Sequence, residues 1–169
     1  MASELGVQTI QHTNGTDALT IDSSGNVSLT QVSTGDFYRE GTWTPTYTGN
    51  TTDPTVTYTV QIGNYIRIGN LVHASFELDA NTFSGGSGNL QISGLPFTSK
   101  DDVRATGVCQ YERFNLDGRT QAVLHLPGNQ TVITPLEEGD NIDLSGIDMA
   151  SFVGSRKVRG SITYITDDA

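Results

Sequence analysis

The stretch Leu71-Val-His-Ala-Ser-Phe-Glu-Leu78 alternates between apolar and polar side chains from Val72 onward. Successive side chains of a β-strand point to opposite faces, so this period of two predicts a strand with one buried face. Gly69-Asn70 directly before it suits a tight turn, and Tyr65–Ile68 on the other side of that turn is a second strand signal. We therefore predict a hairpin across residues 65–78.

Short runs of the same kind continue outward in both directions along the chain. The 169 residues include 19 glycines, which favour tight turns, and no amphipathic helical pattern is present. Roughly ten short strands without a helix are typical of an all-β sandwich or a barrel-like roll. The other predicted strands are Thr42–Thr48, Val56–Val60, Leu90–Ile92, Ala105–Arg113, Thr120–Leu126, Gln130–Thr134 and Val158–Ile165, and segment 135–155 is either a short strand or a long loop.

The first 40 residues differ from the rest of the chain. Two short alternating runs, Ala18–Ile21 and Val27–Thr30, are joined by the turn signal Asp22-Ser-Ser-Gly-Asn26. An isolated hairpin of this size is marginal in water, so it needs either the main domain or another copy of the chain as a partner. We predict an N-terminal anchoring or linker segment over residues 1–40 and a β-domain over residues 41–169.

The formal net charge of −10 limits the partners that this chain can have. A surface this acidic repels phosphate backbones and anionic lipids, although solubility alone is the simpler explanation of the charge. The N-terminus lacks the charged and apolar regions of a signal peptide, and no run approaches the roughly 18 apolar residues of a membrane helix. We expect synthesis in a cytoplasm, no nucleic-acid binding and no membrane insertion.

The sequence carries no motif that marks an active site, and we expect neither an enzyme nor a cofactor. Cys109 lies in an alternating apolar run, so a buried core thiol is favoured over a nucleophile. His12, His73 and His125 follow no metal-ligand spacing, although a three-fold axis could bring together three copies of one of them. The acidic segment 137–148 could hold calcium, but its spacing departs from known calcium loops and a solvated loop is favoured.

Aromatic residues with polar neighbours at loop tips suit contacts with a glycan or a protein. The competing interpretation, that these rings cover the edge of the core, is the simpler one for each residue. Asp117-Gly118 is the strongest hairpin signal in the chain, and several candidates precede it. The candidate binding residues are Phe83, in the glycine-rich stretch 81–89, and Tyr111, Arg113, Phe114 and Asn115.

Three motifs follow one another in the first half of the β-domain: Gly41-Thr-Trp-Thr-Pro45, Ile62-Gly-Asn-Tyr-Ile-Arg-Ile-Gly-Asn-Leu-Val72 and Ile92-Ser-Gly-Leu-Pro-Phe97. This order resembles the C-terminal domains of many phage tail-fibre and virion structural proteins. The segment Ala18–Val27 resembles the linker repeats that precede such domains. The motif residues are Gly41, Trp43, Pro45, Gly63, Tyr65, Gly69, Gly94 and Pro96.

Each of these motifs also has a structural interpretation of its own. Pro45 lacks a backbone donor, so its strand should be at an edge or bulged there. Trp43 is the only tryptophan in the sequence. We favour a role for its large ring in filling the core or a subunit interface over a role in binding sugar. We expect Gly63 and Gly69 to allow either positive φ or close backbone approach. Leu95-Pro-Phe97 is expected to form an apolar plug where a strand leaves its sheet.

The resemblance implies a jelly roll like those of C1q and tumour necrosis factor, assembled as a parallel homotrimer on the surface of a phage particle. It implies contacts with other virion proteins through residues 1–40 and with a glycan or protein of the host surface. An alternative with the same fold is an architectural head-decoration, neck or tail connector protein that binds only virion proteins. A small hydrolase acting on surface glycans is a third, less favoured alternative.

Overall fold

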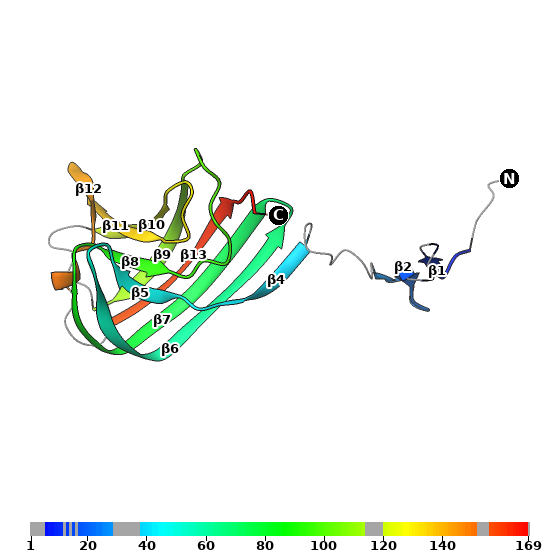
Figure 1. The fold of residues 1–169 in the computed structure, drawn as a ribbon, viewed down its shortest axis with the longest axis horizontal. Helices are drawn as coiled ribbons and strands as arrows, with labels where there is room; N and C mark the ends of the chain where they lie inside the picture. The colour runs from blue at the N-terminus through cyan, green and yellow to red at the C-terminus, as the bar shows by residue number, and fades with distance from the viewer. Residues whose placement is uncertain are drawn as a thin grey trace.

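The computed structural model describes residues 6–11, 13, 15, 17–28, 38–113, 120–151 and 156–168. Within these residues the chain forms a small N-terminal sheet and a larger β-domain (Figure 1). The small sheet is antiparallel and consists of β1 (Thr9–Gln11), β2 (Asp17–Ile21) and β3 (Val27–Ser28). The described residues contain no α-helix and no helix that is long and apolar enough to span a membrane.

The described part of the larger domain is built on an eight-stranded antiparallel sheet with the order β12-β11-β10-β9-β13-β7-β6-β4. A two-stranded sheet of β5 and β8 packs on one of its faces, so the predicted all-β sandwich is confirmed. The strands are β4 (Tyr38–Trp43), β5 (Thr46–Gly49), β6 (Thr52–Ile68), β7 (Leu71–Ser87), β8 (Leu90–Ser93), β9 (Ala105–Glu112), β10 (Gln121–Leu126), β11 (Thr134–Gly139), β12 (Ile142–Gly146) and β13 (Arg156–Ile165), with a 3-10 turn η1 at Met149–Ser151.

The β6–β7 hairpin is the longest feature of the sheet. It contains the predicted hairpin at residues 65–78, and Gly69 in the turn has a φ of 56°. The two predicted strands at 56–60 and 65–68 are parts of one strand, β6. An irregularity in its pairing with β7 between Thr57 and Val60 interrupts the alternation of side chains in the sequence, but the strand continues through it. β7 likewise continues past Leu78 to Ser87.

The core lies between the eight-stranded sheet and the β5–β8 layer. The inward side chains of β7 include Val72, Ala74, Phe76 and Leu78, all of which are buried. The single buried face predicted from residues 71–78 is therefore confirmed. The two-stranded layer contributes Tyr47, Leu90 and Ile92 from the opposite side of the core, so it closes the sandwich on this face.

Trp43 fills the centre of the core, as its favoured interpretation expects. Its side chain is 7% exposed and lies edge-on to the Phe76 ring at 5.9 Å between centroids. The indole N–H donates to the backbone oxygens of Asn64 and Ser75, at 3.3 and 3.2 Å. A Cβ at Gly63 would lie only 2.6 Å from indole Nε1, so this glycine allows the close approach that was expected.

The chain changes layers at Pro45. β4 ends at Trp43 as the edge strand of the large sheet, and β5 begins at Thr46 in the small one. The prediction of one continuous strand over 42–48 was therefore wrong, because Thr44-Pro45 crosses between the layers. The edge position expected for the Pro45 region is confirmed.

The remaining motif residues shape the start of β4 and the exit from β8. A Cβ at Gly41 would lie 3.0 Å from the Tyr65 ring, and Tyr65 lies edge-on to Phe97 at 5.3 Å. Gly94 has a φ of 99°, and the chain then passes through Pro96 between two buried side chains, Leu95 and Phe97. The predicted apolar plug is confirmed.

Several boundaries differ from those predicted. β4 begins at Tyr38, so the start of the large sheet precedes the predicted domain boundary at residue 41. The predicted strand 130–134 is irregular up to the bridge between Ile92 and Ile133, and its last residue, Thr134, begins β11. Gln130 exchanges hydrogen bonds with Ser99 instead of joining a ladder. Segment 135–155 holds most of β11, all of β12 and η1.

Candidate binding site between β9 and β10

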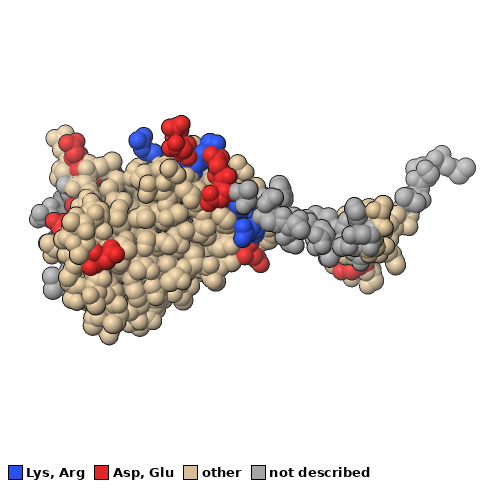
Figure 2. All heavy atoms as spheres, viewed as in Figure 1, with Lys and Arg blue, Asp and Glu red and all other residues tan. Residues whose placement is uncertain are grey.

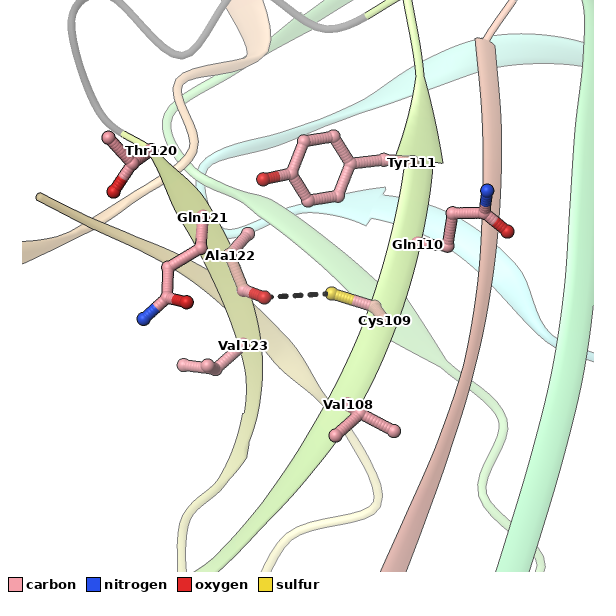
Figure 3. A pocket seen from close by; sticks show the side chains of 8 residues that line it. All are labelled: Val108, Cys109, Gln110, Tyr111, Thr120, Gln121, Ala122 and Val123. Atoms are coloured by element: carbon pink, nitrogen blue, oxygen red, sulfur yellow. Dashed lines mark hydrogen bonds between the residues drawn. The ribbon is translucent and has the colours of Figure 1, made fainter.

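Strands β9 and β10 separate toward the end of their hairpin. Residues 105–108 of β9 pair with residues 123–126 of β10, and the pairing between the two strands stops there. The rest of β9 is paired only with β13, and the first residues of β10 are paired only with β11. The separation leaves a hollow of about 410 Å³ (Figure 3). Its lining consists of Val108, Cys109, Gln110, Tyr111, Thr120, Gln121, Ala122 and Val123.

Side chains bridge the gap where the ladder is missing. The Cys109 thiol donates to the backbone oxygen of Ala122 at 3.4 Å. The Tyr111 hydroxyl also forms a hydrogen bond with the backbone of Ala122. Figure 3 shows the Tyr111 ring directed across the gap toward β10. Burial raises the pKa of Tyr111, so the phenol stays neutral at physiological pH and can donate or accept a hydrogen bond.

The hollow combines one aromatic ring with neutral polar groups. Gln121 at the start of β10 and Thr120 directly before it supply an amide and a hydroxyl opposite Tyr111, and Gln121 also donates to Glu138. Neutral donors and acceptors beside an aromatic ring suit a ligand with hydroxyl groups and an apolar face, and sugars have both.

A smaller, charged hollow lies beside the end of β9. It has a volume of about 90 Å³ and is lined by Asp79, Glu112, Arg113 and Lys157. Lys157 and Asp79 form an ion pair at 3.1 Å across β13 and β7. Arg113 has a φ of 65°, a left-handed conformation that ends β9 and turns the chain away from the ladder.

Both hollows lie at one end of the large sheet, which we call the distal end. The strand register places Asp79, Lys157 and Glu112 side by side there. At the opposite end, which we call the β4 end, Tyr38 pairs with Ile68 and Leu71 pairs with Ile165. β4 begins at this end, and the C-terminus lies near it (Figure 1).

The structure brings together two of the predicted binding residues, Tyr111 and Arg113, next to these hollows. Phe114 and Asn115 lie outside the described residues. The interpretation of Phe83 as a loop residue was wrong, because it is 7% exposed within β7 and lies edge-on to Tyr47 at 5.7 Å. The glycines and serines around it belong to the end of a long strand and not to a loop.

The sequence did not single out the β10 side of the site. Thr120 and Gln121 lay within a predicted strand, and nothing in their local pattern showed that this strand would separate from β9. The only available signal was their position next to the turn predicted at Asp117-Gly118, which lies outside the described residues. The separation depends on which neighbour each strand pairs with, and that is a property of the assembled sheet.

Other candidate chemistry is dispersed over the domain. In the described part of the chain, no group of three or more His, Cys, Asp and Glu side chains is placed to hold a metal ion. His73 Nδ1 lies 2.9 Å from the Thr163 hydroxyl on the outside of the sheet, His125 is in β10, and His12 lies outside the described residues. Within the acidic segment, Glu137 is buried, whereas Asp148 accepts a hydrogen bond from the Ala150 amide at 2.8 Å.

The Cys109 thiol should be chemically inert in the folded protein. Burial raises its pKa from 9.0 to about 11, so at pH 8 its thiolate should be about 100-fold scarcer than in the unfolded chain. We expect iodoacetamide to alkylate it slower by about that factor in buffer than in urea at the same pH. Because the folded-state pKa is the higher one, the neutral thiol stabilises the fold below pH 9, and this contribution is lost as the pH rises from 9 to 11. Equal alkylation rates in both conditions would contradict this.

Comparison with known proteins shows one relevant likeness in fold. The domain superimposes on part of the crystal structure of the Dettilon tailspike protein (gp208), a phage tailspike, with a TM-score of 0.58 and 20% sequence identity. The likeness covers 74% of this chain and 23% of the tailspike chain, so this chain matches a small part of that protein's length. No family model and no curated protein matches the sequence.

Proposed function

We propose that this chain is a structural protein of a phage virion, a homotrimeric fibre or knob that contacts the host surface through the distal end of its β-domain. The likeness in fold to a tailspike supports the virion setting. The observation that carries the binding role is the hollow between β9 and β10, where Tyr111 faces Gln121 and Thr120 across a gap in the sheet. No chemical step is part of this proposal.

The position of the hollow suits an attachment protein. The chain enters the large sheet through β4 at one end, and the hollow opens at the other. An attachment protein needs this separation, because the end that joins the particle must not block the end that meets the host. Residues 1–40 would then provide the contact with other virion proteins.

The chemistry of the hollow favours an uncharged part of a surface glycan as the ligand. Stacking on the Tyr111 ring would supply affinity, and the Gln121 amide and Thr120 hydroxyl would orient the sugar hydroxyls. One open hollow of this size binds weakly. Several copies held together would add avidity, which raises the overall affinity without any new contact.

The proposal is tested by measuring how much labelled protein binds to cells of the host bacterium and to their purified lipopolysaccharide. We expect Tyr111→Ala and Gln121→Ala to reduce binding by about tenfold or more, because a truncated aromatic or amide anchor removes a central contact. Gln130→Ala, an exposed glutamine outside the hollow, is the matched control and should bind as wild type does. Circular dichroism checks that each variant is folded.

Two outcomes would overturn the proposal. Folded Tyr111→Ala and Gln121→Ala variants that bind cells as wild type does would remove the hollow from the binding surface. A wild-type chain that binds particles lacking it, but neither cells nor lipopolysaccharide, would instead support the architectural role in the head, neck or tail. Release of reducing sugars from the lipopolysaccharide would support a hydrolase.

A further inference from the structure

One face of the large sheet is left open. The β5–β8 layer covers the inner face, and no described strand covers the other, which we call the outer face. Sheets of this kind usually alternate buried apolar with exposed polar side chains. The outer face should therefore be polar if it is in contact only with water.

The outer face carries an apolar row at the β4 end instead. The strand register places Tyr38, Ile68, Leu71 and Ile165 in this row, across four strands. In the rows beyond it, Ile66 and Ile62 are outward apolar residues among polar neighbours. On β6 and β7 the exposed fractions are 54% for Ile62, 44% for Ile66, 49% for Ile68 and 46% for Leu71.

The other half of the same two strands provides an internal comparison. Toward the distal end, the outward positions of β6 and β7 are occupied by Thr55, Thr57, Thr82 and Ser84, all exposed. Thr57 and Thr82 share a hydrogen bond at 2.6 Å across the strands. This half has the composition of a surface that meets water. The isoleucines of the β4 half therefore point to a partner there.

The charged side chains of β7 and β13 on the outer face pair within the chain. Arg159 pairs with Glu77 at 3.0 Å and Lys157 pairs with Asp79 at 3.1 Å. The Glu40 carboxylate on β4 accepts a hydrogen bond from the Tyr38 hydroxyl at 2.7 Å. Figure 2 shows that charged side chains gather along one margin and at one end of the domain in that view, and that most of the surface between them is uncharged. Because the ion pairs of β7 and β13 cancel locally, these two strands present little net charge to a second copy, although each chain carries −10 overall.

The N-terminal sheet has a second apolar face. Ile10 pairs with Leu19, and Ile21 pairs with Val27. Residues directly opposite each other on paired strands share a face, and so do residues two positions apart on one strand, such as Leu19 and Ile21. All four side chains therefore lie on one face, with Ile10 and Val27 more than half exposed. No strand of the larger domain, within its described residues, pairs with this sheet.

We propose that copies of this chain associate through the outer face of β4, β6, β7 and β13 and through the apolar face of the N-terminal sheet. Every copy carries both faces, so self-association covers them together, whereas foreign partners would have to cover each face separately. Four strands about 4.8 Å apart with about six residues each at ~3.3 Å present roughly 380 Å², and the N-terminal sheet adds roughly 200 Å². The sum is close to about 600 Å² per partner, the lower end of the range for a standard interface.

This inference deepens the proposed function, which needs several copies side by side, but it can be tested without any host ligand. Light scattering after size exclusion gives the mass of the full chain in solution. We expect the wild type to be an oligomer, and Ile66→Lys and Ile68→Lys to raise its dissociation constant at least tenfold. Leu144→Lys is the matched control, because Leu144 on β12 is 57% exposed but lies at the far edge of the sheet, and it should leave the mass unchanged.

A second variant protects the test against misfolding. Ile66→Thr introduces the residue type that occupies outward positions at Thr57 and Thr82. Threonine is well tolerated in strands, so this variant should fold, and the loss of the apolar side chain should still weaken association. A monomeric wild type at micromolar concentration, or an unchanged mass in folded Ile66→Thr and Ile68→Lys, would overturn the inference. Tyr111→Ala should remain an oligomer, so loss of host binding and loss of association are separate results.

Discussion

Replacement of Trp43 by alanine is expected to lower the free energy of unfolding by about 3–5 kcal/mol, which is the usual cost of removing a large ring from a packed core. The indole is buried against Phe76 and Gly63, and its N–H donates to two backbone oxygens of the β6–β7 hairpin. Truncation therefore leaves a cavity and also two carbonyl oxygens without this donor.

Urea unfolding followed by circular dichroism measures this loss, since the substitution removes the only tryptophan and with it the usual fluorescence signal. Trp43→Phe is the control. It keeps most of the ring volume but not the N–H, so we expect it to cost less than half as much as the alanine. A Trp43→Ala variant within about 1 kcal/mol of wild type would show that the indole does not organise the core.

Replacement of Gly63 by alanine is expected to cost about 2–3 kcal/mol, because the new methyl group would lie 2.6 Å from indole Nε1. The indole cannot easily move, since it is held between the hairpin backbone and Phe76. The same unfolding experiment measures the change.

A double-mutant cycle shows whether this contact is the cause. In a Trp43→Ala background the indole is absent, so Gly63→Ala should cost at least about 1 kcal/mol less than in wild type. Gly69→Ala is the control for backbone conformation alone, because a Cβ there meets open space at a φ of 56°, and it should cost about 1 kcal/mol in both backgrounds. Additive effects of Trp43→Ala and Gly63→Ala would contradict the packing explanation.

The candidate site was only partly predictable. Tyr111 and Arg113 were found because aromatic and charged residues next to an Asp-Gly turn mark the end of a hairpin. Phe83 was misplaced because its neighbours Ser84, Gly85 and Gly86 suggest a loop, whereas the structure uses them at the outward side and end of a long strand. Local composition does not distinguish a strand end from a loop when the strand is held by a partner distant in sequence.

The outer face shows a similar limit. Residues 62–68 and 71–78 contain isoleucines and a leucine on the side opposite the buried set, and the sequence alone does not say whether that side is covered by another layer. The structure places the β5–β8 layer on the other side only. The exposed apolar positions therefore became apparent from the tertiary structure.

The sequence by itself determined the all-β class, the hairpin at residues 65–78, its single buried face and the place of Trp43 in the core. These features depend on alternation, turn residues and side-chain size, which act between residues close in the chain or at a single position. The tertiary structure alone decided the crossing at Pro45, the burial of Phe83, the separation of β9 from β10 and the open outer face. These depend on which distant strands become neighbours, and that choice is made by the packing of the whole sheet.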